Sequence, residues 1–326
     1  MKKTLAMSLM LPLAAIAKPV LTVSTYDAFA ADWGPAPAIE KAFEAQCDCD
    51  LQFVTGESSI GLLRKVQLEG DSTDTDIILG LDTNTMELAR ETGLFATHDW
   101  PQDALELPVE WSESTFVPFD YSIFAFVYQK DRLATPPTSL EALRSLPEDV
   151  KFVIQDPRSS TPGLGLVLWV KSVYGDDAAQ FWADAADSIL TVTPGWSEAY
   201  NLFLQGEADM ALSYTTSPAY HRIAEGDDRF AWAPFAEGHQ GQIEVAAALK
   251  SSDQPALAAQ FLNFIVSPGF QDAIPTGNWA YPVIAMDMPE NFDVQPRPEP
   301  FRLADPKRVE AEREAVIAEF LSAIGQ

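Results

Sequence analysis

The chain has 326 residues, 47% of them hydrophobic, and a formal net charge of −27. The apolar fraction is ample for packed cores, and the length exceeds that of one average domain, which indicates two lobes. So acidic a chain repels phosphate backbones, which argues against a nucleic-acid partner. The charge also suits a well-solvated surface, so it does not by itself identify a ligand.

The first 17 residues have the pattern of a secretory signal peptide. Two lysines follow Met1, and residues 5–17 are apolar or small and end in the A-x-A-like motif Ala15-Ile16-Ala17. We expect residues 1–17 to be removed, leaving a secreted chain that is not inserted in a membrane. The alternative is a membrane anchor, but a span needs about 20 apolar residues. No cysteine stands at the cleavage motif, which argues against a lipid anchor.

Strand and helix patterns alternate in the first part of the chain, as is typical of an α/β fold. The expected elements are strands at Val20–Tyr26, Leu51–Thr55 and Asp76–Leu81 and helices at Pro37–Ala45 and Ile60–Leu68. This βαβαβ order predicts a parallel sheet whose ligand crevice lies at the carboxyl ends of the strands.

The pattern changes in the middle of the chain. Phe116–Phe119 and Phe124–Gln129 are aromatic-rich extended runs with no helix between them. The elements expected after them are strands near Phe152 and at Leu190–Val192, Met210–Tyr214 and Ile243–Leu249, and helices after Thr161, at Asp177–Ser188, after Ser197, at Gln254–Val266 and at Asp305–Ile324. Two α/β series predict two lobes with a ligand cleft and hinge closure between them. A single large sheet is the alternative.

The expected lobes are discontinuous in sequence. Lobe 1 comprises residues 18–120 plus 237–275, and lobe 2 comprises residues 121–236 plus 276–326. A single hinged protein of this kind is expected to be a monomer.

Two strand-to-helix loops carry hydroxyl groups just before a proline. Ser160 and Thr161 precede Pro162, with Thr161 as the expected N-cap, and Ser217 precedes Pro218. Helix N-termini offer unpaired N–H groups and partial positive charge, so the two loops could together hold one phosphate. The alternative for each loop is an ordinary helix cap.

Aromatic residues accompany these loops. Trp196 precedes an expected helix that Ser197 would cap, and the alternative role for Trp196 is core packing. Tyr214 and Tyr220 flank the second loop, and a Gly-Asn turn presents Trp279. Tyr220 and Trp279 could clamp a flat cationic heterocycle, at about 2 kcal/mol for each desolvated cation–π contact. At the ends of the first two strands, Tyr26, Glu57 and Ser58 could bind ligand or be solvated loop residues.

Other chemistry has little support in the sequence. The two cysteines, Cys47 and Cys49, could form a local disulfide or stay a free pair, and with only three histidines in the chain no metal site is expected. None of these histidines stands beside a Ser or Cys in a recognisable motif, so no catalytic residues are assigned. A secreted hydrolase with a triad assembled in space remains an alternative.

The chain resembles the bacterial periplasmic thiamine-binding proteins, the receptors of thiamine ABC importers. The similarity covers essentially the whole mature chain. It is strongest in KPVLTVSTYDAFAADWGP (18–35), FVPFDYSIFAFVY (116–128), QDPRSSTPGLGL (155–166), YGDDA (174–178), TPGWSEAY (193–200), SYTTSPAYH (213–221) and AIPTGNWAYPV (273–283).

The resemblance implies a type II periplasmic-binding fold and the capture of thiamine, thiamine monophosphate and thiamine pyrophosphate for an ABC permease, with no catalysis and no cofactor. Tyr220 and Trp279 would sandwich the ring system. The phosphate or hydroxyethyl end would be held by Ser160, Thr161, Trp196, Tyr214 and Ser217, with Tyr26 nearby.

One position departs from the family's pattern. Where family members have an acidic residue after the glutamate of the second loop, this chain has Ser58, so Glu57 or Asp27 could balance the thiazolium charge instead. A polyamine receptor of the same fold is the alternative function, because it would also suit the acidic composition.

Overall fold

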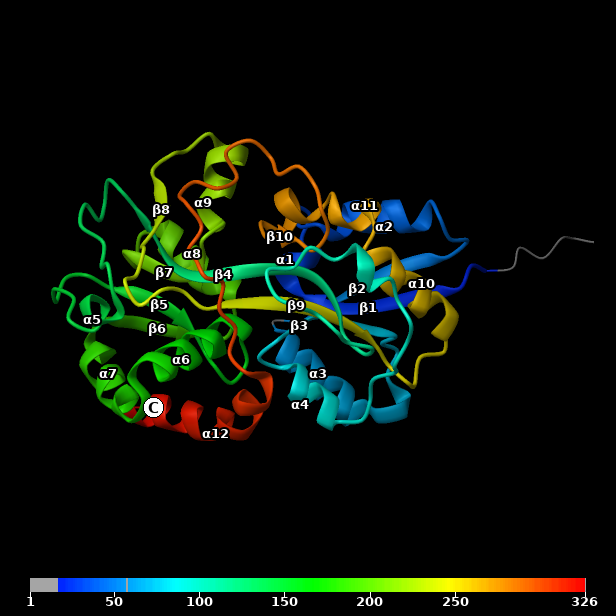
Figure 1. The fold of residues 1–326 in the computed structure, drawn as a ribbon, viewed down its shortest axis with the longest axis horizontal. Helices are drawn as coiled ribbons and strands as arrows, with labels where there is room; N and C mark the ends of the chain where they lie inside the picture. Colours follow the sequence, from blue (N-terminus) through cyan, green and yellow to red (C-terminus); the bar gives the residue numbers. More distant parts are fainter. Residues whose placement is uncertain (1–16, 57, 326) are drawn as a thin grey trace, which may run out of the picture.

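The computed structural model describes residues 17–56 and 58–325. Figure 1 shows an elongated molecule with two α/β halves side by side, and strands β4 (Val117–Gln129) and β9 (Gly241–Ala248) crossing its centre. The strand order is β2-β1-β3-β9-β4-β7-β5-β6, and β8 and β10 also pair with β4. The signal-peptide prediction for residues 1–17 falls almost wholly outside the described residues.

The first half contains the predicted βαβαβ unit. Strand β1 (Val20–Tyr26) pairs in parallel with β2 (Asp50–Gly56) and with β3 (Ile77–Asp82), and β3 runs antiparallel to β9. Its helices are α1 (Asp27–Ala30), α2 (Ala36–Glu44), α3 (Ser59–Glu69), α4 (Met86–Glu91), α10 (Pro255–Ile265) and α11 (Pro268–Gln271). Aromatic residues of α2, α10 and α11 pack on one face of this sheet, and α3 and α4 cover the other.

The second half repeats this layered plan. Its strands are β5 (Phe152–Gln155), β6 (Ile189–Thr193), β7 (Met210–Tyr214) and the short β8 (Phe230–Trp232), and the two-residue β10 (Tyr281–Pro282) joins the central sheet. Its helices are α5 (Leu140–Leu143), α6 (Thr161–Tyr174), α7 (Ala178–Ala185), α8 (Trp196–Gln205), α9 (Ser217–Tyr220) and α12 (Pro306–Ala323). Helices α6, α7 and α12 share one core, and α8 packs on the opposite face.

Short irregular helices complete the chain. Turns of 3-10 helix occur at Gly70–Ser72, Gln102–Ala104, Gly175–Asp177 and Ala186–Ser188, and π-helical turns at His221–Glu225 and Ile274–Asn278. Within the described part of the chain, no helix is long and apolar enough to cross a membrane.

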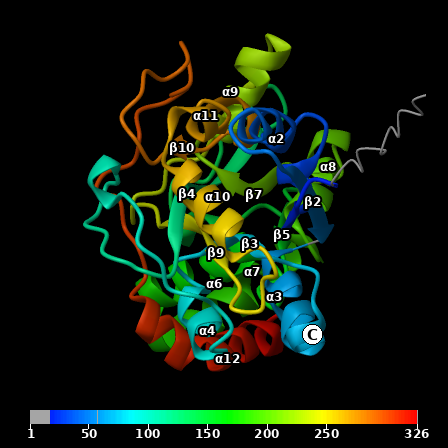
Figure 2. The ribbon, with the colours of Figure 1, turned by 90° about the vertical axis from the view of Figure 1, so that its right-hand side faces the viewer.

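The central strand β4 differs from the prediction. The two aromatic runs, apart from Phe116, are one strand of 13 residues, because residues 120–123 continue the extended backbone between them. Residues Val117–Ile123 pair with β9 and residues Phe124–Tyr128 pair with β7, so a single strand belongs to both halves. Helix α12 also contacts both halves, since it packs against α6, α7 and α4, along the lower edge in Figures 1 and 2.

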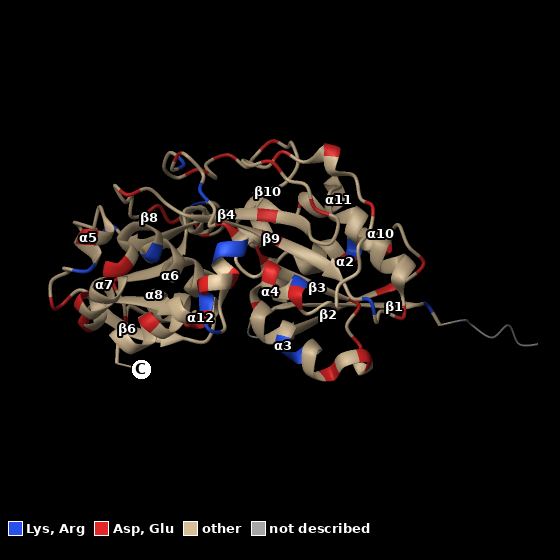
Figure 3. Cartoon of the chain, turned by 60° about the horizontal axis from the view of Figure 1, so that its bottom comes forward, with Lys and Arg blue, Asp and Glu red and all other residues tan. Residues whose placement is uncertain are grey.

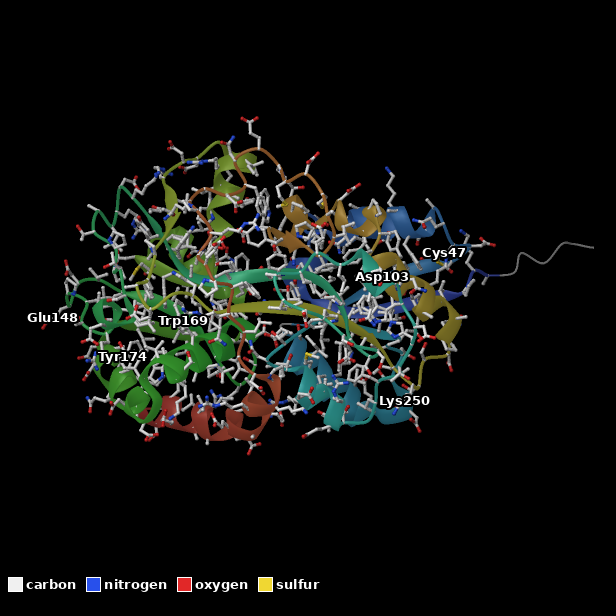
Figure 4. The ribbon with its side chains drawn as sticks, in the orientation of Figure 1. Cys47, Asp103, Glu148, Trp169, Tyr174 and Lys250 are labelled. Atoms are coloured by element: carbon white, nitrogen blue, oxygen red, sulfur yellow. A yellow bond between two sulfur atoms is a disulfide. The ribbon has the colours of Figure 1, made fainter. Side chains whose placement is uncertain are left out.

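Cys47 and Cys49 form a disulfide, which decides between the two alternatives left open by the sequence. Figure 4 places Cys47 at one end of the molecule, beside β1 and β2, and Trp169 in the opposite half. The disulfide links two residues of the turn that leads into β2. It lies far from the centre of the molecule. Acidic residues are spread over both halves in Figure 3, in keeping with 48 Asp and Glu against 21 Lys and Arg.

Candidate ligand-binding site

A cavity of about 520 Å³ lies between the two halves. Its size is in the range of small-molecule sites. The first half contributes the ends of β1 and the start of α3, and the second half contributes the loops before α6, α8 and α9. Nine of the predicted site residues line it: Tyr26, Ser58, Ser160, Thr161, Trp196, Tyr214, Ser217, Tyr220 and Trp279. The tenth, Glu57, lies outside the described residues.

Helices α6 and α8 both begin at the cavity. The carbonyl of Ser160 accepts the first helical hydrogen bond of α6, from the backbone N–H of Leu164 at 3.0 Å, so Ser160 is the N-cap. Thr161 was predicted in that role and is instead the first helical residue. The predicted cap of α8 is also wrong, since Gly195 is the N-cap and Ser197 lies inside the helix.

Neither helix start is capped by its own N-cap side chain. The first N–H groups of a helix have no intrahelical partner, and they carry the positive end of the helix dipole. The loop turns tightly before α6 because the carbonyl of Asp156 accepts the N–H of Ser160 at 2.9 Å. Two helix starts without a side-chain cap, those of α6 and α8, face one cavity and form an anion-binding arrangement. The predicted pair was α6 and α9, but the Ser217 hydroxyl at the start of α9 is bonded to Ser213 and to the N–H of Tyr214.

Several polar groups of the second half are used within the protein. The indole N–H of Trp196 donates to Ser213 Oγ at 2.8 Å. Ser217 Oγ lies 2.7 Å from Ser213 Oγ and accepts the N–H of Tyr214 at 3.2 Å. These bonds shape the loop between β7 and α9. By contrast, the Ser160 hydroxyl has no hydrogen-bond partner among the described residues and is free for a ligand.

The two predicted clamp residues lie next to each other. The rings of Tyr220 and Trp279 have centroids 5.4 Å apart and an interplanar angle of 77°, an edge-to-face contact. They therefore do not form parallel walls in this structure, and a ring ligand would have to separate them. Trp279 has a backbone φ of 54°, the left-handed region that non-glycine residues seldom adopt. Such backbone strain is often found at binding sites.

Several residues of the cavity wall were not among the predicted site residues, and two of them bond to the Tyr26 hydroxyl. Glu244 of β9 and Asn278, before Trp279, both line the cavity. The Tyr26 hydroxyl donates to Glu244 Oε2 at 3.1 Å and accepts from Asn278 Nδ2 at 2.9 Å. A signal for Glu244 existed, because a glutamate inside an otherwise apolar strand is rare unless it is paired or functional.

Known proteins resemble the chain over its whole length. Residues 23–272 match the family described as bacterial extracellular solute-binding protein. A thiamine-binding periplasmic protein of Escherichia coli K12 is 51% identical over 326 residues, 100% of both chains, and one of Haemophilus influenzae is 40% identical over 90% of this chain and 89% of its own. A solved structure named periplasmic thiamin binding protein is 51% identical, with a TM-score of 0.93 over 97% of this chain and 100% of that one.

The chain belongs to the bacterial extracellular solute-binding protein family. Its fold is the type II periplasmic-binding fold, so the predicted α/β class with two lobes and a cleft between them is confirmed. The family is one of solute-binding transport proteins and not of enzymes.

This solute-binding protein carries three carboxyl groups side by side, and one of them, Glu244, lines the cavity. Asp82 of β3 and Asp120 of β4 both pair in register with Glu244 of β9, which runs between them. Asp82 and Asp120 are fully buried and Glu244 is 6% exposed. Burial raises the pKa of Asp82 to about 6 and that of Asp120 to about 7. Burial, together with the charge of Asp120, raises the pKa of Glu244 well above its ordinary value.

These carboxyls give the empty protein a pH-dependent stability. A group whose folded-state pKa is raised binds its proton more tightly in the folded state, so its contribution is present at low pH and is lost as pH rises through the folded pKa. Between pH 5 and pH 8 we expect the free energy of unfolding to fall by about 4 kcal/mol from Asp82 and Asp120 alone. Urea denaturation of the ligand-free protein across this range measures it.

A matched variant separates the effect of these three carboxyls (Asp82, Asp120 and Glu244, together called the carboxyl ladder) from the effect of general charge repulsion. Asp120→Asn removes one raised pKa but changes the net charge of −27 by one only. We expect the pH dependence to flatten clearly in this variant. An unchanged slope would mean that surface repulsion alone causes it.

Proposed function

We propose that this chain captures thiamine, thiamine monophosphate and thiamine pyrophosphate in the periplasm and delivers them to the permease of an ABC importer. One observation carries the proposal: a single cavity joins an aromatic pair, Tyr220 and Trp279, to two uncapped helix starts rich in hydroxyl groups. Thiamine phosphates combine a flat cationic ring system with an anionic tail. The full-length similarity to proteins named for thiamine binding supports the same ligand.

The two ends of the cavity suit the two ends of that ligand. The aromatic faces attract a cationic ring, while the N–H groups at the starts of α6 and α8 attract a phosphate. No Lys, Arg or His is among the described residues that line the cavity. The tail would thus be held by hydrogen bonds and helix dipoles. Because no buried cationic side chain would be left without its phosphate, the site could also bind unphosphorylated thiamine.

Delivery depends on secretion and on a hinge. Residues 1–17 would act as the signal peptide, and the mature chain would work as a monomer without a cofactor. The proposed lobes are residues 18–120 plus 237–275 and residues 121–236 plus 276–326. Strand β4 would serve as part of the hinge, since it is shared by both halves. Closure over the ligand would then create the surface that docks on the permease.

Calorimetric titration of the mature protein with thiamine, its two phosphates and spermidine tests the proposal. We expect submicromolar binding of the thiamine forms, recovered chemically intact by mass spectrometry. Binding of spermidine alone would make the protein a polyamine receptor. Conversion of a bound thiamine form would make it a hydrolase. Either result overturns the proposed function.

The phosphate end is tested by Ser160→Ala. We expect thiamine monophosphate and pyrophosphate to bind at least about tenfold more weakly, because a hydrogen bond to a charged group contributes about 1.5–3 kcal/mol. Thiamine itself should change by less than threefold. Ser172→Ala is the control, since its hydroxyl donates to the Trp169 carbonyl near the other end of α6. An equal loss for all three ligands would refute the assignment of the phosphate end.

A further inference from the structure

Among the described residues, no cation balances the carboxyl ladder of Asp82, Glu244 and Asp120. Like charges directly opposite each other on neighbouring strands are destabilising. The hydrogen-bond partners of these carboxyls among the described residues are neutral: Asn84 and Thr85 for Asp82, Asn278 for Asp120, and Tyr26 for Glu244. Such an arrangement lowers stability, and proteins keep such costs mainly at functional sites.

One oxygen atom of the carboxyl ladder lacks a hydrogen-bond donor among the described residues. Asp120 Oδ1 is buried and has no hydrogen-bond donor among the described residues. Its cross-strand partner Glu244 is also a carboxyl, so the two can bond only when one of them holds a proton. The titratable groups that face this pair are Tyr26 from β1, Tyr214 from β7 and Asp82 from β3. None of them is positively charged.

Glu244 is the member of the ladder that reaches the cavity. It lines the cavity wall although it is only 6% exposed. The other described carboxyl of the cavity is Asp27, which is exposed and accepts the N–H of Ala28 at 2.8 Å. Ser58 is neutral and caps α3 through the N–H of Gly61. A charge at Glu244 is poorly screened by water, whereas a charge at Asp27 is well screened.

We propose that Glu244, supported by Asp120, is the specificity-determining counter-charge for the cationic part of the ligand, and that the pair gives up its shared proton when the cation binds. The inference rests on the proposed function and identifies the group that would select a cationic ligand over a neutral one. In the empty cavity the pair holds one proton, which forms a hydrogen bond between the two carboxyls. When the positive ring enters, this one proton leaves to water, and both carboxyls are then ionised. A neutral ring of the same shape would not drive this step.

The test compares thiamine with 3-deazathiamine, in which a neutral thiophene replaces the thiazolium ring. Wild-type protein should prefer thiamine at least tenfold at pH 7.5. In Glu244→Gln that preference should fall below threefold, because thiamine loses affinity and the neutral analogue does not. Asp82→Asn is the matched control: it removes a buried carboxyl of the same ladder that does not line the cavity. It should keep the wild-type preference.

Proton release gives a second measurement. Titrations at pH 7 in buffers of different ionisation enthalpy should show about half a proton or more released per thiamine bound by wild type, none by Glu244→Gln, and none with the neutral analogue. Thiamine affinity of wild type should weaken several-fold from pH 7.5 to pH 5.5, and that of the variant should not. Melting of the ligand-free variant should be unchanged or higher, since a buried ionisable carboxyl has been replaced by a neutral amide of the same size.

The outcomes separate this inference from the proposed function. If wild type binds thiamine but shows no preference over the neutral analogue, or if Glu244→Gln keeps both the preference and the proton release, Glu244 is not the counter-charge. If wild type binds neither compound, the proposed function itself fails. A variant that melts lower and loses both ligands equally would make Glu244 a structural residue and would overturn the inference.

Discussion

Replacing Trp279 by alanine is expected to weaken thiamine, thiamine monophosphate and thiamine pyrophosphate together by about 100-fold, which corresponds to about 2.7 kcal/mol. The indole supplies a cation–π contact of about 2 kcal/mol and a large apolar face, both directed at the ring system shared by all three ligands. The uncapped starts of α6 and α8 are unaffected by the change. The loss should therefore be independent of phosphorylation.

Calorimetry with the three ligands measures this result. Trp279→Phe is the graded control, because it keeps an aromatic face of smaller area and should lose clearly less affinity than the alanine variant. Circular dichroism should show an unchanged fold, since Trp279 is only partly buried. If only the phosphorylated ligands weakened, Trp279 would belong to the phosphate end and the proposed clamp with Tyr220 would be wrong.

Replacing Gly80 by alanine is expected to lower the free energy of unfolding by about 3 kcal/mol and thiamine affinity by at least tenfold. Gly80 lies at the bulge of β3 with a φ of 110°, a conformation that side chains rarely tolerate. A Cβ here would lie 2.6 Å from the ring of Tyr26 and 2.8 Å from Ser59 Oγ. The ring would have to move away from Glu244, and with it the wall of the cavity.

Urea denaturation and calorimetry measure the two effects. Gly70→Ala is the matched control, because Gly70 also has a positive φ, 57°, but a Cβ there would meet no atom within 4 Å. We expect this variant to lose about 1 kcal/mol of stability and no affinity. If Gly80→Ala behaved like Gly70→Ala, the close contact with Tyr26 would not matter for the site.

Local patterns in the sequence determined much of the fold. Strands β1 and β7 have the predicted bounds, and most of the other predicted elements differ by one or two residues, because periodicity and turn residues are local signals. The loops before α6, α8 and α9 were found for the same reason, since a proline or glycine beside hydroxyl residues marks a helix start wherever it occurs. The exact caps, Ser160 and Gly195, were not found, because a cap depends on which carbonyl closes the preceding turn.

Only the tertiary structure decided how the site is assembled. The union of two aromatic runs into β4 joins the halves, and it depends on pairing with β9 and β7, which lie more than 80 residues further along the chain. Asp82 and Asp120 are unremarkable in sequence, and they become neighbours of Glu244 because register between distant strands places the three residues opposite one another. Register follows from the packing of whole faces of a sheet, so no local pattern contains it.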